Sequence, residues 1–183
     1  MNTSSRTSTL VMSALMVAII TVSIMFIKLP IPFTQGYVHL GDAMIFMSVM
    51  ILGWKHGAIA AAIGGALGDI LGGFAMWAPW TFCLKGIMAL ILGIMLSYAL
   101  KKQWVMIGRM PLGGVLGMIA GGVVMVAGYY AAEGIMYGNW AVAALGIPWN
   151  IGQFVVGMII AWALTMALTK TSAKKFFAYR FEK

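Results

Sequence analysis

The residues best suited to chemistry in this chain are Asp69 and Lys85, because each lies inside an otherwise apolar stretch. The whole sequence of 183 residues holds only four acidic side chains. A charge at membrane depth is costly unless it is paired or reached by water, and it marks a candidate functional site. Two interpretations stay open: Asp69 and Lys85 form a structural salt bridge, or they face a water-filled cavity.

Further polar side chains are expected at the same end of the molecule as these two charges. Taken singly, each has an ordinary structural interpretation. Asp42 follows Gly41 at an expected helix start, where a carboxylate commonly caps the helix, and Glu133 is expected to end a helix at the interface. Taken together, they predict a polar pocket that includes His39, Asp42, Glu133, Asn150 and Gln153.

Four tryptophans fall at the same level of the chain: Trp77, Trp80, Trp140 and Trp149. Tryptophans at that level usually form an aromatic belt at the membrane surface. They could equally provide walls on which a planar ring stacks within a pocket.

The composition indicates that a lipid bilayer surrounds these residues. The chain is 62% hydrophobic and 9% charged, with a mean hydropathy of +0.97. Backbone groups in lipid must be satisfied internally, which leaves helices or a closed barrel, and the apolar runs lack the alternation of a barrel strand. We therefore predict an all-α integral membrane protein that forms one compact domain over residues 1–183.

About six apolar segments are long enough to cross a bilayer or nearly so: 9–27, 41–53, 57–73, 79–100, 112–132 and 146–169. The second and third are short and are separated by Trp54-Lys55-His56, which favours a helical hairpin, with a single re-entrant unit as the alternative. Glycines repeat at every fourth position at Gly64, Gly68 and Gly72 and again at Gly113, Gly117 and Gly121, a spacing that permits close helix contact.

The basic residues predict the orientation. With the N-terminus in the cytoplasm, nearly all lysines and arginines fall on the cytoplasmic side and only Lys28 lies in an outer loop, so both termini are expected to be cytoplasmic. The tail from Lys174 to Arg180 is expected to anchor on anionic lipid. The outer loop 28–40, stiffened by Pro30 and Pro32, is expected to act as a lid.

Several functions are excluded or disfavoured by what the sequence lacks. It has no Walker A motif, no HExxH and no GxSxG, and it has too few clustered histidines, cysteines and acids for a metal site. Cys83 is the single cysteine, so no disulfide forms within the chain. The net charge of +8 lies in short loops and tails, as topology requires, and does not indicate nucleic-acid binding. No cofactor is expected.

Several of these features together resemble one family. They are Ala14 and Ala18 in the first segment, His39-Leu-Gly-Asp42 at the start of the second, and the block from Gly57 to Asp69 followed by Lys85-Gly86. The chain resembles the substrate-binding S components of energy-coupling factor (ECF) vitamin transporters over most of its length. The resemblance implies a multi-pass protein of the bacterial cytoplasmic membrane that captures a vitamin or precursor from outside. It would then join a transmembrane coupling subunit and two ABC-type ATPases, toppling in the membrane to release its ligand.

The resemblance also implies which residues contact the partners. The Ala-xxx-Ala face of the first segment, at Ala14 and Ala18, would dock on the coupling subunit. The ligand would contact the first outer loop and the outer ends of the later helices. Together with the charge and aromatic arguments above, this gives the predicted binding set Tyr37, His39, Asp69, Trp80, Lys85, Glu133, Trp149, Asn150 and Gln153.

The substrate is narrowed only to a branch of that family, assigned to hydroxymethylpyrimidine, pyridoxine, pantothenate or cobalamin. The outer aromatic residues, with both acids and a lysine, favour a small planar heteroaromatic with hydroxyl groups, and a pantothenate carboxylate on Lys85 would fit nearly as well. Two other classes stay open on the residues alone. One is an intramembrane enzyme that uses Asp69, His39 or Glu133, and the other is a membrane scaffold with a structural Asp69–Lys85 bridge.

Overall fold

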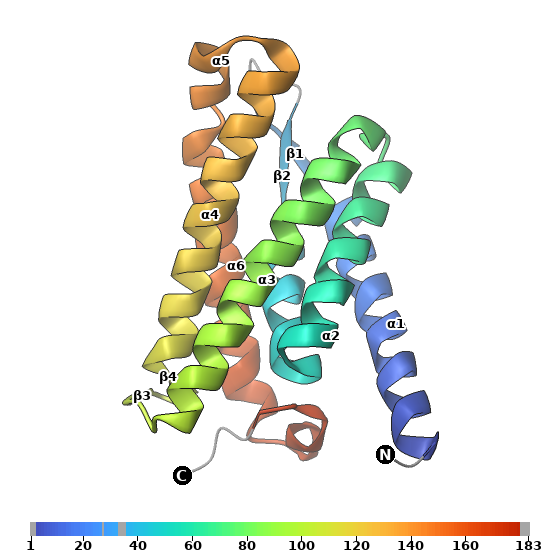
Figure 1. The fold of residues 1–183 in the computed structure, drawn as a ribbon, viewed down its shortest axis with the longest axis vertical. Coiled ribbons are helices and arrows are strands. Elements are labelled where there is room, and N and C mark those ends of the chain that lie inside the picture. The colour runs from blue at the N-terminus through green and yellow to red at the C-terminus, as the bar shows by residue number, and fades with distance from the viewer. Residues whose placement is uncertain (1–2, 27, 33–35, 180–183) are drawn as a thin grey trace.

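The fold is a bundle of long helices, seen in a computed structural model that describes residues 3–26, 28–32 and 36–179, with side chains from Arg6 onward. Five helices in this part of the chain are long and apolar enough to cross a membrane. The long helical elements are α1 (Thr3–Phe26), α2 (Gly41–Leu71), α3 (Ala78–Lys101), α4 (Leu112–Tyr137) and α6 (Ile147–Leu168) (Figure 1). An all-helical membrane protein is thus confirmed, whereas the count of six helices is not.

Helix α2 folds back on itself at Gly53, where the backbone leaves the helical region with φ 78° and ψ 174°. Ser48 Oγ donates a hydrogen bond to the carbonyl of Gly57, at 3.1 Å. Nine residues of straight helix would separate these positions by about 13.5 Å along the axis. Residues 41–52 and 54–71 are therefore two arms of one hairpin, in line with the expected turn near Trp54.

The arms of α2 form the centre of the bundle. Helix α2 packs against α1, α3 and α6, and α4 packs against α3 and α6. The glycine stripes lie at these contacts: Gly64 and Gly68 meet Ile20 and Ile24 of α1, and Gly117 and Gly121 meet Leu92 and Met88 of α3. A Cβ at Gly121 would lie 2.7 Å from the Met88 carbonyl oxygen, so only glycine allows this approach.

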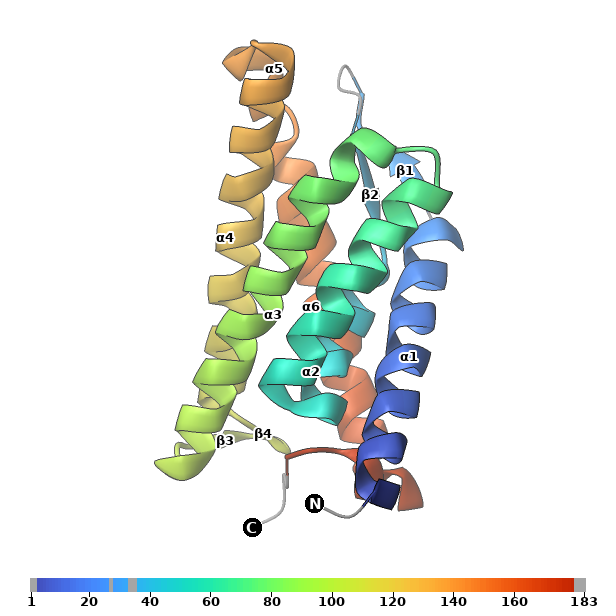
Figure 2. The same cartoon turned by 45° about the vertical axis from the view of Figure 1, so that its right-hand side comes forward.

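Short elements cover one end of the bundle, called here the β1–β2 end (Figure 2). Strands β1 (Lys28–Pro30) and β2 (Tyr37–His39) pair antiparallel, with Lys28 opposite His39. The 3-10 helix η1 (Ala75–Trp77) joins α2 to α3, and α5 (Trp140–Ala144) joins α4 to α6. Within the predicted outer loop 28–40, residues 33–35 lie outside the described part of the chain.

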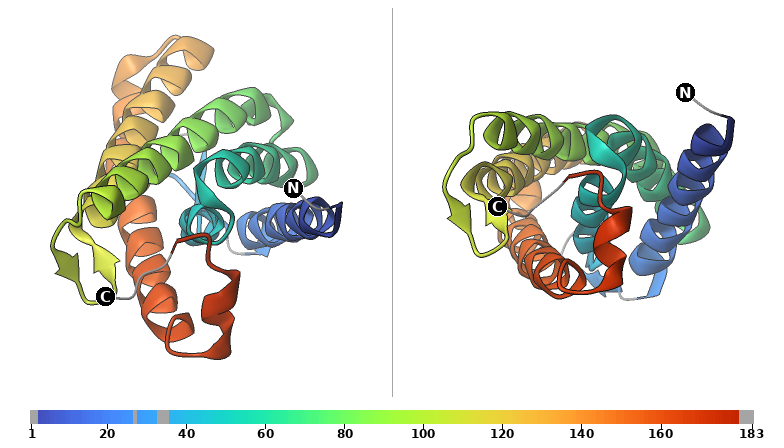
Figure 3. Two further views of the ribbon diagram at one scale, coloured as in Figure 1. Left: turned by 60° about the horizontal axis from the view of Figure 1, so that its bottom comes forward. Right: turned by 90° about the horizontal axis from the view of Figure 1, so that it is seen from below.

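The opposite end, called here the tail end, carries β3 (Met106–Ile107), β4 (Met110–Pro111) and the 3-10 helix η2 (Ser172–Phe176) (Figure 3). The segment after η2 crosses the turn of α2, where the Ala178 N–H donates to the Met50 carbonyl at 3.1 Å. The Tyr179 and Ser97 hydroxyls are 3.0 Å apart. The predicted tail cations Arg180 and Lys183 lie outside the described residues.

Several predicted boundaries differ from the observed ones. Helix α1 begins at Thr3 rather than residue 9, and α4 runs to Tyr137 rather than 132. Hydropathy locates where apolar residues stop, but a helix continues through polar residues that have partners or a polar pocket beside them. Glu133 consequently lies inside α4 with 3% of its surface exposed, and the expectation that it ends a helix is wrong.

Candidate functional site

A polar pocket opens at the β1–β2 end, between the β1–β2 strand pair and helices α2, α3, α4 and α6. Its described lining consists of Ile31, Gly36, Tyr37, His39, Asp69, Trp77, Thr81, Tyr129, Glu133, Asn150 and Gln153. The volume in which the centre of a water molecule fits is about 20 Å³, enough for about one or two waters. A ligand with a ring therefore requires the surrounding side chains to move apart.

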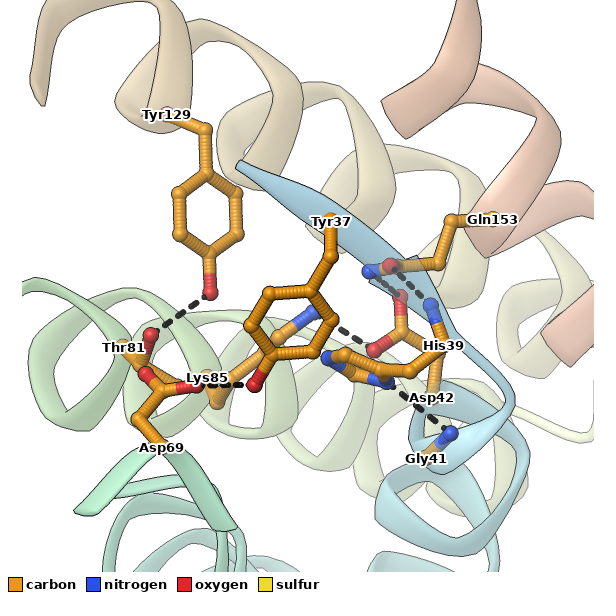
Figure 4. Close-up of polar contacts among 9 residues, drawn as sticks. All are labelled: Tyr37, His39, Gly41, Asp42, Asp69, Thr81, Lys85, Tyr129 and Gln153. Atoms are coloured by element: carbon orange, nitrogen blue, oxygen red, sulfur yellow. Dashed lines mark hydrogen bonds and ion pairs between the residues drawn. The ribbon is translucent and has the colours of Figure 1, made fainter. Parts of the chain in front are cut away.

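Lys85 and Asp42 form a buried ion pair beneath this pocket. The Lys85 ammonium donates to Asp42 Oδ1 at 2.5 Å, and neither side chain is exposed (Figure 4). The Lys85 nitrogen also lies 5.3 Å from the centre of the Tyr129 ring, a distance at which the ring face attracts a cation. The expected pairing of Lys85 with Asp69 is therefore wrong, as is the expectation that Asp42 caps a helix.

Gln153 connects the ion pair to strand β2. Its Nε2 donates to Asp42 Oδ2 at 3.1 Å, and its Oε1 accepts the backbone N–H of His39 at 2.9 Å. Four chain segments, from α2, α3, α6 and β2, are thereby joined by one continuous set of hydrogen bonds.

The hydrogen bonds of His39 determine where its imidazole carries a proton. Nδ1 accepts the N–H of Gly41 at 3.0 Å, so a neutral ring must carry its proton on Nε2. Burial, and next the nearby charge of Lys85, lower the pKa of His39 from 6.5 to about 3. The side chain is therefore neutral at physiological pH, and Nε2–H is a donor. In Figure 4 this nitrogen points away from Gly41, to the side of Tyr37.

Asp69 is bound by Tyr37 of strand β2 rather than by a lysine. The Tyr37 hydroxyl donates to Asp69 Oδ1, and burial followed by the Asp69 carboxyl raises the pKa of Tyr37. Lys28 lies over the Tyr37 and Phe74 rings, 5.1 Å from each centre, and donates to the Gly72 carbonyl at 3.0 Å. Asp69 lines the pocket beside Thr81, and its Oδ2 has no partner that meets hydrogen-bond geometry among the described residues.

Four buried polar atoms near or in this pocket have no hydrogen-bond partner among the described residues: Asp69 Oδ2, Glu133 Oε2, Trp77 Nε1 and the Tyr137 hydroxyl. Unpaired buried polar groups are rare in folded proteins, because each costs about 1–3 kcal/mol. Such a cluster, with donors and acceptors together, is suited to a ligand that supplies the complementary groups.

Aromatic rings form part of the pocket wall. The Trp77 ring lies 6.0 Å from that of Tyr129 and 6.2 Å from that of Tyr137. The Tyr37 ring lies 4.3 Å from that of Phe74, tilted by 43°. Rings of this kind bury a planar ligand by contact with its faces. The pocket can therefore bind a flat polar molecule; no group of three or more metal-ligating side chains occurs in the described residues.

The structure brings together six of the nine predicted binding residues: Tyr37, His39, Asp69, Glu133, Asn150 and Gln153 all line the pocket. It does not bring in the other three. Lys85 forms its ion pair with Asp42, and Trp80 packs against the core. Trp149 is 42% exposed and lines a separate groove between the β1–β2 strand pair and α6.

Five lining residues were absent from the predicted binding set: Ile31, Gly36, Trp77, Thr81 and Tyr129. Of these, Trp77 had been considered as a wall on which a ring could stack. The Thr81 and Tyr129 hydroxyls lie 3.0 Å apart. A helical signal points to them, because residues four apart share a helix face. Trp77 and Thr81 precede Lys85 at this spacing, and Tyr129 precedes Glu133.

Comparisons with known proteins place the fold and the family. A family model described as "ECF-type riboflavin transporter, S component" matches residues 4–170. A solved structure titled as the S component of a bacterial ECF transporter superposes with a TM-score of 0.66 at 22% identity, covering 90% of this chain and 97% of that one. The latter shows the shared fold.

Two relatives extend the comparison. An uncharacterized protein of Pyrococcus woesei is 36% identical over 151 residues, 82% of this chain and 95% of that one. The thiamine precursor transporter HmpT of Lactococcus lactis is 27% identical over 143 residues, 78% of this chain and 76% of its own length. The resemblance predicted from the sequence is confirmed: the chain belongs to the family of S components of ECF-type vitamin transporters.

Proposed function

We propose that this protein is the S component for a small nitrogen heteroaromatic that carries hydrogen-bond donors, such as hydroxymethylpyrimidine, with pyridoxine as the related alternative. The ligand binds in the pocket at the β1–β2 end, which faces the outside of the cell. The protein catalyses no reaction on it.

The observation that carries this proposal is the pair of uncommitted carboxyl oxygens, Asp69 Oδ2 and Glu133 Oε2. Both residues line the pocket. An amino group or a ring N–H of the ligand would satisfy these acceptors, each of which costs about 1–3 kcal/mol while it stays buried and unpaired. The Nε2–H of His39 and the Trp77 indole N–H would serve ring nitrogens and hydroxyl oxygens of the same ligand.

The same chemistry disfavours an anionic ligand. A pantothenate carboxylate would need a cation, and Lys85, the residue expected to supply it, is neutralised by Asp42. Two carboxyl groups would then face the ligand's own carboxylate. Pantothenate is therefore less favoured than an uncharged heteroaromatic.

The size of the pocket favours a small ligand. With about 20 Å³ open to water centres, a single ring demands less rearrangement than a flavin or a corrinoid. The relative HmpT is named as a thiamine precursor transporter, which supports a pyrimidine. Riboflavin is the second candidate, supported by the description of the matching family model.

Transport requires partners that supply energy. We infer a transmembrane coupling subunit and two ABC-type ATPases, with this chain in the cytoplasmic membrane of a prokaryotic cell and both termini in the cytoplasm. The basic residues at the tail end support this orientation. Ala14 and Ala18 are exposed on α1, as docking on the coupling subunit requires.

Titration calorimetry of the purified protein tests the ligand assignment. The panel is hydroxymethylpyrimidine, pyridoxine, riboflavin, pantothenate and cobalamin, each added to the protein in detergent. We expect saturable binding of hydroxymethylpyrimidine with a Kd on the order of nanomolar and no turnover. Binding of pantothenate, riboflavin or cobalamin alone would overturn the assignment.

A further inference from the structure

The Lys85–Asp42 pair is fully buried, yet it does not line the pocket. A buried ion pair is weak evidence for stability, because its desolvation offsets most of its attraction. This pair is also not isolated: through Gln153 it reaches the strand that carries His39. Its position therefore calls for a role other than ligand contact.

The charge of Asp42 determines how the Gln153 amide is oriented. An ionised Asp42 that holds the Lys85 ammonium can only accept hydrogen bonds, so the amide nitrogen of Gln153 must face it. The amide oxygen of Gln153 then faces the opposite way, toward the His39 N–H. Without the carboxylate charge, Gln153 could rotate its amide by half a turn and present a donor to that N–H, which would break the contact.

We propose that Lys85 and Asp42 are positioning residues that act through Gln153 to hold β2 in place, so that His39 presents its Nε2–H donor to the ligand. Gly41 completes the arrangement from the other side by donating to Nδ1. Figure 4 shows the four side chains in sequence, from Lys85 through Asp42 and Gln153 to His39.

The charged groups around His39 also favour a neutral imidazole. The charged groups that act on the imidazole are Lys85 of α3, Asp42 of α2 and Lys28 of β1, of which Lys85 has the largest effect and lowers the pKa of His39. An imidazole that stays neutral keeps one nitrogen without a proton, as the hydrogen bond from Gly41 requires. Loss of Lys85 would weaken both the orientation of Gln153 and this electrostatic effect.

The proposal takes the pocket as the ligand site and so rests on the proposed function, but its first test needs no ligand. The chain has two histidines, His39 and His56, so nitrogen-15 labelling of histidine gives two imidazoles, and a His56→Gln variant assigns them. We expect the His39 signals to report a neutral ring protonated only at Nε2 from pH 5 to 8. A ring protonated at Nδ1, or a charged ring at neutral pH, would overturn the proposal even if every ligand assignment were correct.

Variants then test the route through Gln153. The double variant Asp42→Asn with Lys85→Met removes both charges and leaves no unpaired ion. We expect a mixture of His39 tautomers and an affinity for hydroxymethylpyrimidine lower by about tenfold, the size of one lost hydrogen bond. In a Gln153→Met background the same double change should have no further effect on the tautomer.

Thr165→Val provides the matched control. Thr165 is buried in α6, the helix that carries Gln153, and donates to Met50 Sδ of α2 at 2.8 Å. This change loosens the packing of α2 on α6 without touching the hydrogen bonds to His39, so the tautomer should stay fixed. The proposal fails if Thr165→Val mixes the tautomers as the double variant does, or if the double variant leaves His39 unchanged.

Discussion

The ammonium group of Lys85 lies 2.5 Å from a carboxylate oxygen of Asp42, on the arm of α2 opposite the one that carries Asp69. Because α2 folds back at Gly53, Asp42 and Asp69 reach the same end of the bundle from opposite ends of one element. Lys85 therefore has two acids near its depth. It pairs with the deeper-buried Asp42, and Asp69 remains at the pocket, bonded to Tyr37.

Removing only one partner of the ion pair should destabilise the protein strongly. Lys85→Met leaves the Asp42 carboxylate buried without a countercharge, at a cost of about 3–5 kcal/mol. Thermal unfolding in detergent measures the effect. The double variant Asp42→Asn with Lys85→Met should recover most of the loss, and a double variant no more stable than Lys85→Met would contradict the assigned pairing.

Stability should depend on pH through His39. The pKa of His39 is lowered to about 3 in the fold, whereas the unfolded chain binds a proton below about pH 6.5. Stability from this residue is complete above about pH 6.5 and is lost as the pH falls toward 3, by up to about 1.4 kcal/mol per pH unit. Between pH 7.5 and pH 5, the free energy of unfolding should therefore fall more in wild type than in His39→Gln. An equal fall in both proteins would count against a neutral, buried His39.

A glycine at the contact between the two arms of α2 should tolerate substitution less well than an exposed glycine of α6. A Cβ at Gly57 would lie 2.6 Å from Val49 Cα, on the opposite arm, so Gly57→Ala should cost about 1–3 kcal/mol. Gly152 has nothing within 4 Å of its Cβ position, and Gly152→Ala should be neutral or slightly stabilising. Equal unfolding temperatures for the two variants would argue against close contact of the arms.

Substitutions on the exposed face of α1 should impair docking on the coupling subunit without impairing ligand binding. Ala14 and Ala18 are exposed and lie four residues apart, on one face of the helix. Replacing both by tryptophan should abolish vitamin uptake in cells that carry the coupling subunit and ATPases, while the purified variant keeps its wild-type affinity. The pair Ser8→Trp with Phe26→Trp, at exposed positions on another face of α1 at 3.6 residues per turn, controls for bulk alone. Normal uptake by the Ala14/Ala18 variant would place the docking face elsewhere.

Most of the fold follows from the sequence because long apolar runs in a bilayer permit few structures, whereas the family was reached through the resemblance of motifs such as His39-Leu-Gly-Asp42. The turn near Trp54 was predicted because a short basic segment divides two apolar runs. The helix ends at Thr3 and Tyr137 were not predicted, since hydropathy does not register a helix that continues into polar residues such as Glu133.

The partners of the buried charges could not be predicted in the same way. The sequence analysis paired Asp69 with Lys85 by their similar expected depth, but depth does not fix the rotation of a helix about its axis. These helices are apolar all round, so no polar stripe reveals which face turns inward. The pairing of Asp42 with Lys85 was also hard to predict, because an acid in the first turn of a helix is ordinarily explained by its favourable interaction with the helix N-terminus. The signal available for the pocket wall was four-residue spacing, of Trp77 and Thr81 before Lys85 and of Tyr129 before Glu133.

The central claim is that a donor-bearing heteroaromatic binds against the uncommitted oxygens of Asp69 and Glu133. Its most direct test is calorimetric titration of hydroxymethylpyrimidine into wild type, Asp69→Asn, Glu133→Gln and the control Thr165→Val. We predict saturable binding to wild type and the control, and affinity reduced by about 10- to 100-fold in each carboxyl variant, because each loses a strong hydrogen bond. Undiminished affinity in both carboxyl variants, or no binding to wild type, would contradict the account.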